Sequence, residues 1–254
     1  MSSSKRAEVW VVLPTYDEAE NLEKIVGEIA DRLPGSHRIL VVDDNSPDGT
    51  GEIADRLAGH RSDLEVLHRT EKQGIGPAYL AGFTRALDAG ASTIVQMDAD
   101  FSHDPVYLPE LIAATRQADL AIGSRYIRGG GVENWGATRR MISKGGSTYA
   151  RLVLGVEVRD LTGGFKAWRA DALERIDLDA VATRGYAFQV EMTYRALCAG
   201  MEVVEVPIVF KDRDLGASKM SRSILIEAIW RVPAMRLRRG SSAQAGSDSP
   251  NTGL

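Results

Sequence analysis

The chain has 254 residues, of which 26% are charged, and its formal net charge is −4 at pH 7. This length can bury the full core of one large domain. The acidic balance argues against a general nucleic-acid binder, because such a protein needs a positive field to attract phosphate backbones. The one cysteine, Cys198, excludes an internal disulfide and fits a reducing compartment. No apolar run is long enough to span a membrane, and the first residues form no signal segment.

Strands and helices alternate through the first hundred residues. The predicted strands, which are apolar and rich in β-branched residues, are 8–13, 37–42, 64–68 and 93–97. Helical periodicity follows the first three of them, over 18–33, in the segment after the acids at 43 and 44, and over 76–89. This alternation indicates right-handed βαβ units, and therefore an α/β fold with a mostly parallel sheet flanked by helices. We predict one domain over 8–220, whose first half, 8–104, binds the nucleotide.

The second half, 105–220, has a looser pattern. The predicted helices are 107–118, 147–154 and 188–199, and the predicted strands are 119–124 and 202–210. Residues 127–146 contain a GGG run and an Arg-Arg pair without clear periodicity, which predicts a long mobile loop. The terminal segments 1–7 and 241–254 are expected to be tails, the second of them disordered.

A C-terminal amphipathic helix is predicted over 221–240. Its apolar stripe consists of Leu225, Ala228, Ile229 and Val232. Pro233 should bend or end this helix, and Arg236, Arg238 and Arg239 follow it. Such a segment can lie on an anionic membrane surface. The alternative is a terminal helix that packs on the protein's own core and has a solvated basic end.

Two acids, Asp98 and Asp100, directly follow the strand predicted over 93–97. Open α/β sheets bind their ligands at the carboxyl ends of the strands. Alternate residues of an extended chain point the same way, so both carboxylates can face one target while Ala99 faces away. A hard divalent ion, Mg²⁺ or Mn²⁺, that holds a substrate diphosphate would complete such a pair. The alternative is an Asp-rich surface turn.

Polar residues also follow the first two predicted strands. Tyr16 could stack on a nucleotide base, and Glu18 could accept hydrogen bonds from ribose hydroxyls. Asp43 and Asp44 could accept hydrogen bonds from a base or a ribose. Helix capping and turn formation are the alternatives for both loops. The glycine-rich segment 69–82 lacks the G-x-G-x-x-G spacing, which disfavours a dehydrogenase.

Basic side chains in the second half lie in predicted loops on the presumed catalytic side. Arginine suits bidentate contacts with phosphate, which a phosphate-handling enzyme without a P-loop needs. A solvated surface is the alternative for each residue. The set consists of Arg125, Arg139, Arg140, Lys211, Arg213 and Lys219.

These motifs in their order resemble the GT-A fold, family 2 glycosyltransferases, and among them the polyprenol-phosphate (dolichol-phosphate) mannose synthases. The motifs are LPTYDEAEN, VVDDNSPDGT, the Gly-rich helix entry, MDADFSH, GSRY, LTGGFKAW, FQVEM and the SK that contains Lys219. The resemblance extends from Val9 to Lys219. It implies that mannose passes with inversion from GDP-mannose to a polyprenyl phosphate. It also implies a peripheral protein on the cytoplasmic face of a membrane. An integral membrane protein is a candidate partner, since some relatives are anchored by a separate or fused protein of this kind.

The resemblance makes 105–220 the acceptor half and assigns roles to particular residues. The donor would contact Pro14, Tyr16, Glu18, Val42, Asp44, Asp98, Ala99, Asp100, Arg213 and Lys219. Catalysis is assigned to Asp98, Asp100 and Arg125, and the acceptor phosphate to Arg125, Arg139 and Ser143. The metal would be held by Asp98, Asp100 and Ser102. Some relatives have Gln at the position of Ser102, and because a hydroxyl is a weaker ligand, Ser102 is expected to bind through water.

Two other functions remain open. One is the same fold using UDP-glucose to make a polyprenyl-phosphate glucose, although such relatives commonly carry added membrane helices. The other is a catalytically silent subunit that binds a nucleotide sugar and recruits a membrane enzyme. The intact DAD, GSRY and SK motifs argue against a silent subunit, because mere binding needs no site for a leaving group.

Overall fold

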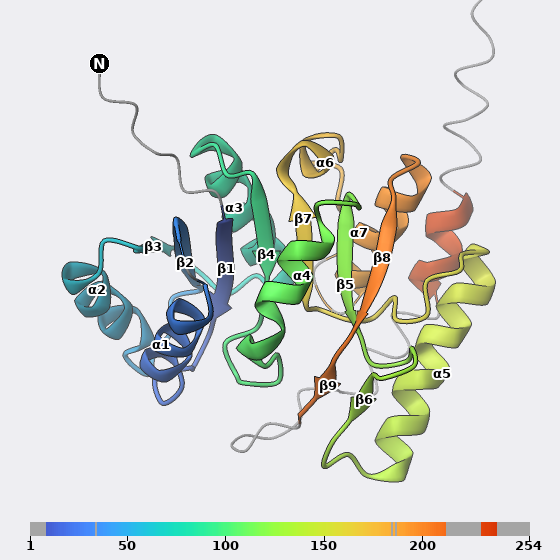
Figure 1. Ribbon diagram of the computed structural model, residues 1–254, viewed down its shortest axis with the longest axis horizontal. Helices are drawn as coiled ribbons and strands as arrows, with labels where there is room; N and C mark the ends of the chain where they lie inside the picture. The colour runs from blue at the N-terminus through green and yellow to red at the C-terminus, as the bar shows by residue number, and fades with distance from the viewer. Residues whose placement is uncertain (1–8, 34, 184, 186, 212–229, 238–254) are drawn as a thin grey trace, which may run out of the picture.

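A computed structural model describes residues 9–33, 35–183, 185, 187–211 and 230–237. Its main sheet has seven strands in the order β3-β2-β1-β4-β7-β5-β8 (Figure 1). The strands are β1 Val9–Thr15, β2 His37–Asp43, β3 Leu64–His68, β4 Thr93–Gln96, β5 Leu120–Ser124, β7 Lys166–Arg169 and β8 Val203–Pro207. All neighbours pair in parallel except at β7, which is antiparallel to both β4 and β5. A second sheet pairs β6 Gly131–Val132 with β9 Val209–Phe210.

Helices cover both faces of the main sheet. The helices are α1 Leu22–Arg32, α2 Thr50–His60, α3 Ile75–Asp88, α4 Leu108–Ala114, α5 Ala137–Leu154, α6 Ala170–Glu174 and α7 Ala187–Cys198, and η1 Pro105–Tyr107 is a 3₁₀ turn. Alternate residues of the strands divide the core: Val11 and Leu13 pack with α1 and α4, whereas Trp10 and Val12 pack with α3 and α7. This arrangement confirms the predicted α/β fold of the GT-A type, with a mostly parallel sheet flanked by helices.

The glycines of the segment 69–82 serve close packing. A Cβ atom on Gly82 would lie 2.3 Å from Cγ1 of Val12, so α3 can approach β1 only without a side chain there. A Cβ atom on Gly76 would lie 2.8 Å from the carbonyl oxygen of Thr183. Close packing therefore explains why the start of α3 is rich in glycine although it lacks the G-x-G-x-x-G spacing of a dinucleotide-binding site.

Three predictions in the second half were wrong. Residues 127–146 are not one long loop, because α5 begins at Ala137 and contains Gly145 and Gly146. Only Ser147, Ala150 and Leu154 of this helix are buried, so its first half has no apolar stripe to reveal it. The strand predicted over 202–210 divides into β8 and β9, which belong to different sheets. The short elements β7 and α6 were not predicted at all.

Part of the C-terminal helix packs on the core. Residues 230–237 are helical, so Pro233 does not end the helix, and residues 221–229 lie outside the described residues. Val232 is 1% exposed, and Nη1 of Arg236 donates to the carbonyl oxygen of Val153 on α5 at 2.6 Å. Trp230 and Leu237, in contrast, are 76% and 74% exposed. Among the helices that the structure describes, none has the length and hydropathy to span a membrane.

Lys166 on β7 is a buried cation in the middle of the sheet. Its Nζ donates to the carbonyl oxygen of Gln189 at 2.8 Å and to Oε1 of Gln189 at 3.0 Å. Nε2 of Gln96 on β4 donates to the same Oε1 at 2.6 Å. Burial lowers the pKa of Lys166 to about 7, although the charge of Asp160 opposes the shift.

This pKa predicts a dependence of stability on pH. Between about pH 7 and pH 10.5 the unfolded chain holds a proton on Lys166 that the folded chain gives up, so stability rises with pH. We expect the free energy of unfolding, measured in urea, to rise relative to that of Lys166→Met by up to about 1.4 kcal/mol per pH unit. Measurements at pH 6.5, 8 and 9 test this, and a constant difference between the two proteins would contradict it.

Candidate functional site

The carboxyl ends of β1, β2 and β4 lie at one edge of the sheet, as parallel pairing requires (Figure 1). In the described residues, four non-glycine residues have a left-handed backbone: Asp17, Asn45, Phe101 and Asn134, with φ between 58° and 61°. The first three lie in the loops after β1, β2 and β4, and Asn134 lies between β6 and α5. Asp and Asn tolerate this conformation in turns, whereas it is unfavourable for the larger Phe101. Of these four loops, the one after β4 is therefore the one that holds a strained backbone residue.

Hydrogen bonds fix the two acids of the loop after β4. The hydroxyl of Tyr79 on α3 donates to Oδ1 of Asp98 at 2.6 Å, and the backbone N–H of Asp98 donates to Nδ1 of His103 at 3.0 Å. The backbone N–H of Ser102 donates to Oδ1 of Asp100 at 3.1 Å. Asp100 is 6% exposed, whereas the side chain of Asp98 is 26% exposed. Both carboxylates are thus held on the loop at the sheet edge.

The donor atoms of this loop suit a hard divalent ion. Asp98, Asp100 and Ser102 offer only oxygen atoms, which Mg²⁺ and Mn²⁺ prefer. Within the part of the chain that the structure describes, no three His, Cys, Asp or Glu side chains are placed to hold a metal ion. Ala99 is 2% exposed and packs in the core, as expected for the residue between the two acids. The residues therefore fit an ion that takes its remaining ligands from a substrate or from water.

The loop after β1 carries the first donor candidates. Nζ of Lys72 lies 3.5 Å from the ring centroid of Tyr16, which is a cation-π contact. Oε2 of Glu18 accepts from Nδ2 of Asn21 at 2.9 Å, and the backbone N–H of Glu18 donates to Oγ1 of Thr50 at 3.0 Å. The sequence analysis gave Lys72 no role, although this lysine lies within the glycine-rich segment 69–82. The ring of Tyr16 thus has a cation on one face.

The two acids after β2 have different roles. Asp43 accepts from the hydroxyl and the backbone N–H of Ser46, at 2.6 and 3.2 Å, and so forms the turn. Asp44 accepts from Nη1 of Arg69 at 2.5 Å. Burial raises the pKa of Asp44, and the Arg69 charge opposes this shift without cancelling it. Arg69 is a second cation that the sequence analysis missed. A ligand that binds Asp44 must share the Asp44 carboxylate with Arg69.

The remaining candidates of the first half lie in the strands. Pro14 of β1 pairs in register with Val42 of β2. The side chain of Val42 is fully buried in the core, and its carbonyl oxygen accepts from Oγ1 of Thr15 at 3.4 Å. Any contact between Val42 and a ligand would therefore be through its backbone.

Arg125, at the end of β5, forms a buried ion pair with Asp160. Nε and Nη2 of Arg125 each donate to a carboxylate oxygen of Asp160 at 2.7 Å, and Nη2 also donates to Thr162 at 2.9 Å. The backbone N–H of Arg125 donates to Asp160 at 3.0 Å. Burial alone would raise the pKa of Asp160, but the charge and hydrogen bonds of Arg125 hold it below its usual value. Asp160 was not predicted, although it directly precedes the LTGGF motif.

Aromatic rings join Arg125 to α5. The guanidinium of Arg125 lies 5.7 Å from the ring centroid of Trp135, and that of Arg139 lies 4.4 Å from the same centroid. The hydroxyl of Tyr126 donates to Oγ of Ser143 at 2.7 Å. The structure thus brings together Arg125, Arg139 and Ser143, which the sequence assigned to the acceptor phosphate. We call these three residues the acceptor cluster.

Phe210 of β9 connects the acceptor cluster to the loop after β4. Its ring centroid lies 5.4 Å from that of Trp135 and 5.4 Å from the guanidinium of Arg125. It also lies 5.7 Å from the ring centroid of His103, which binds the backbone of Asp98. One chain of ring contacts therefore leads from the guanidinium groups to the loop that carries the two carboxylates.

The other predicted basic residues are not part of this arrangement. Nζ of Lys211 donates to Oδ2 of Asp104 at 2.9 Å. Arg140 is exposed on α5, and its Nη2 lies 3.5 Å from the carbonyl oxygen of Val132. Arg213 and Lys219 lie outside the described residues.

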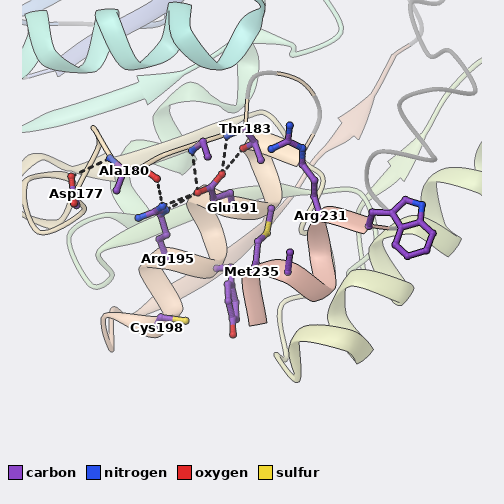
Figure 2. A pocket seen from close by; sticks show the side chains of 12 residues that line it. Asp177, Ala180, Thr183, Glu191, Arg195, Cys198, Arg231 and Met235 are labelled. Atoms are coloured by element: carbon purple, nitrogen blue, oxygen red, sulfur yellow. Dashed lines mark hydrogen bonds and ion pairs between the residues drawn. The ribbon is translucent and has the colours of Figure 1, made fainter. Parts of the chain in front are cut away.

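A cavity of about 670 Å³ lies elsewhere, between α7, the residues before it and the helical residues 230–237 (Figure 2). Glu191 accepts from Oγ1 of Thr183 at 2.6 Å and from Nε of Arg195 at 2.9 Å on one side of it. None of the residues predicted to bind substrate or metal lines this cavity. The loops at the sheet edge, rather than this cavity, therefore form the candidate site.

Comparisons with known proteins place the chain in a known fold and family. The solved structure of glucosyl-3-phosphoglycerate synthase from Mycobacterium tuberculosis, in complex with Mn²⁺, UDP-glucose and phosphoglyceric acid, has the same fold. The two match with a TM-score of 0.65 at 18% identity, over 98% of this chain and 82% of that one.

Two curated relatives are much more similar in sequence. The undecaprenyl-phosphate mannosyltransferase of Micrococcus luteus is 50% identical over 88% of this chain and 92% of its own length. The polyprenol monophosphomannose synthase of Mycolicibacterium smegmatis is 52% identical over 90% of this chain and 86% of its own. The family model described as glycosyl transferase family 2 matches residues 10–177. The chain belongs to glycosyl transferase family 2.

Proposed function

We propose that this protein is a polyprenyl-phosphate β-D-mannosyltransferase, which moves mannose from GDP-mannose to a polyprenyl phosphate. The observation that carries the proposal is the contact between the acceptor cluster and the loop after β4 through Phe210 and His103. Two aromatic rings thus connect guanidinium groups that suit a phosphate to the loop whose carboxylates suit a metal-bound diphosphate. The names of the Micrococcus and Mycolicibacterium relatives support mannose and a polyprenyl phosphate.

The metal site of the proposal consists of Asp98 and Asp100, with Ser102 acting through water. A bound Mg²⁺ or Mn²⁺ would neutralise charge on the departing nucleoside diphosphate. The loop contributes by holding both carboxylates in place through hydrogen bonds to Tyr79, His103 and the backbone. The protein provides two carboxylates and a hydroxyl, so the ion would take further ligands from the diphosphate of the donor. We therefore expect the ion and the donor to bind together.

The acceptor cluster explains how a transferase can work without a strong general base. A phosphate oxygen is already ionised near neutral pH, so no proton has to be removed before it attacks. Arg125 and Arg139 would hold this phosphate on the face of the sugar opposite the diphosphate, and Ser143 would donate a hydrogen bond to it. Attack from the opposite face inverts the anomeric carbon and gives the β-linked product.

The donor would lie across the loops after β1 and β2. In the proposal, Tyr16 stacks on the base, and Glu18 and Asp44 accept from the ribose or the base. The backbone of Pro14 and Val42 borders this pocket. Arg213 and Lys219 are assigned to the diphosphate on the basis of the motif alone.

The experiment that tests the function is a metal-dependent transfer assay with a short polyprenyl phosphate. Labelled GDP-mannose and UDP-glucose are offered separately, and the label that enters the organic phase is counted. Label from GDP-mannose alone supports the proposal, whereas label from UDP-glucose alone identifies the enzyme as a polyprenyl-phosphate glucosyltransferase. Binding of GDP-mannose without any transfer would indicate the silent subunit or a missing integral membrane partner.

The proposal places the protein peripherally on the cytoplasmic face of a membrane. Its acceptor is a lipid, and large apolar side chains are exposed on two neighbouring helices: Met141 and Leu152 on α5, and Trp230 and Leu237 at the C-terminal end. Basic Arg140 and Lys144 are exposed on the same α5. Apolar side chains flanked by cations suit an anionic membrane surface.

Flotation with liposomes tests this placement. The wild type should float with vesicles that contain anionic lipid, and Trp230→Glu combined with Leu237→Glu should reduce the floating fraction severalfold. Val232→Glu is unsuitable here, because Val232 is buried and its replacement would unfold the helix from the core. Unchanged flotation of the double variant would remove these residues from the membrane surface.

A further inference from the structure

Tyr79 on α3 is fully buried next to the proposed metal site, and the sequence analysis gave it no role. Its ring is stacked against Phe83, at 5.8 Å between centroids, and against Phe188 of α7, at 6.0 Å. Such packing leaves an aromatic ring little freedom to reorient. The position of the Tyr79 hydroxyl is therefore set by the core and not by the loop that it contacts.

This hydroxyl donates to Oδ1 of Asp98 at 2.6 Å. Short hydrogen bonds between a hydroxyl and a carboxylate are among the strong ones, because the acceptor is charged. An ionised carboxylate can only accept hydrogen bonds, so the phenolic hydroxyl of Tyr79 is the donor of this bond. The carboxylate is thus anchored to a rigid part of the protein.

Asp98 is also held through its backbone. Its N–H donates to Nδ1 of His103, a residue that is 2% exposed and stacked on Phe165 at 5.0 Å. Two anchors from two different elements therefore fix both the main chain and the side chain of Asp98. With Oδ1 engaged by Tyr79, Oδ2 is the oxygen best placed to coordinate an ion.

We propose that Tyr79 is a positioning residue of the metal site, which holds the Asp98 carboxylate ready for the divalent ion. This inference rests on the metal site of the proposed function, and it adds a residue that touches neither the ion nor the substrate. Hydrogen-bond partners of metal ligands commonly contribute 10–100-fold to metal affinity. Tyr79→Phe removes the hydroxyl and keeps the ring packing.

The test measures Mn²⁺ binding directly, from the electron paramagnetic resonance signal of free Mn²⁺ in the presence of GDP. We expect Tyr79→Phe to weaken Mn²⁺ binding about tenfold or more. Tyr194→Phe is the matched control, since Tyr194 belongs to the same core cluster but lines the cavity of Figure 2. Equal Mn²⁺ affinity of Tyr79→Phe and wild type would overturn the proposal.

Two further measurements separate positioning from a folding defect. Excess Mn²⁺ should restore the transfer rate of Tyr79→Phe at a temperature at which a thermal melt without Mn²⁺ shows the variant to be folded, so that the ion does not act by stabilising the fold. In the background of Asp98→Asn, Tyr79→Phe should cause no additional loss of Mn²⁺ affinity, because the bond to the charged carboxylate is already lost. A full additional loss would show that Tyr79 acts elsewhere.

The binding measurement also distinguishes failure of the inference from failure of the proposed function. If the wild type binds Mn²⁺ with GDP and transfers no mannose, the reaction is wrong and the role of Tyr79 is still measurable. If Asp100→Ala binds Mn²⁺ as tightly as the wild type, the metal site itself is wrong, and the role of Tyr79 fails with it.

Discussion

Replacing Asp100 by Ala should abolish most transfer while the fold survives. In the proposed mechanism this carboxylate holds the ion that neutralises the leaving diphosphate, a contribution of several kcal/mol to transition-state stability. At about 1.4 kcal/mol per tenfold change in rate, a loss of about 4 kcal/mol lowers turnover about a thousandfold. The measurement is the initial rate of label transfer from GDP-mannose at saturating polyprenyl phosphate, together with a thermal melt.

Two matched variants test whether the loss of the Asp100 charge causes this result. Asp100→Asn keeps the size and the acceptor for the Ser102 N–H but removes the charge, so it should be nearly as inactive as Asp100→Ala. Asp88→Ala removes an equivalent charge from the exposed end of α3 and should keep wild-type activity. Near-normal turnover of Asp100→Ala would exclude Asp100 as the metal ligand.

The second large effect concerns Arg125, whose loss should damage both stability and activity. In Arg125→Ala the carboxylate of Asp160, which is fully buried, loses its cation and two hydrogen bonds. Removing one partner of a buried ion pair commonly costs about 3–5 kcal/mol of stability. Chemical denaturation should show this loss, and the KM for polyprenyl phosphate should rise because the acceptor cluster loses a guanidinium group.

A double variant separates the two consequences. Arg125→Met combined with Asp160→Asn removes both buried charges, and such neutral replacements often cost little stability. The double variant should therefore regain most of the stability that Arg125→Ala loses, yet its transfer rate should stay low. If it regains transfer as well, Arg125 serves only the fold, and the acceptor phosphate must be bound by Arg139 and its neighbours.

The first half of the chain was predictable because its signals are local. The run 93–97 is mostly apolar, and the acids that follow it mark the carboxyl end of a strand, so the loop after β4 could be located from sequence. The strand over 64–68 agrees with β3. In this half, the period of the hydrophobic residues, the turn residues and the parallel topology all predict the same arrangement of strands and helices.

The second half of the chain was less predictable, because its key contacts join residues that are distant in sequence. Asp160 neutralises Arg125 from 35 residues away, and no local period marks a buried ion pair. Arg69 and Lys72 contact Asp44 and Tyr16 in the same manner, from other loops. The helix α5 was missed for a different reason, since Gly145 and Gly146 lower its helix propensity and its first half is largely exposed.

The antiparallel strand β7 also has a consequence for how the protein is made. It separates β4 from β5 in the sheet but follows both in the sequence, so β5 cannot join β1–β4 until β7 has left the ribosome. Until then β4 is an open edge, and the nascent chain has the loop after β4 but not the Asp160 that pairs with Arg125. The strands β1–β4 are thus translated first, and a strand of four residues, Lys166–Arg169, joins β5 and β8 to them.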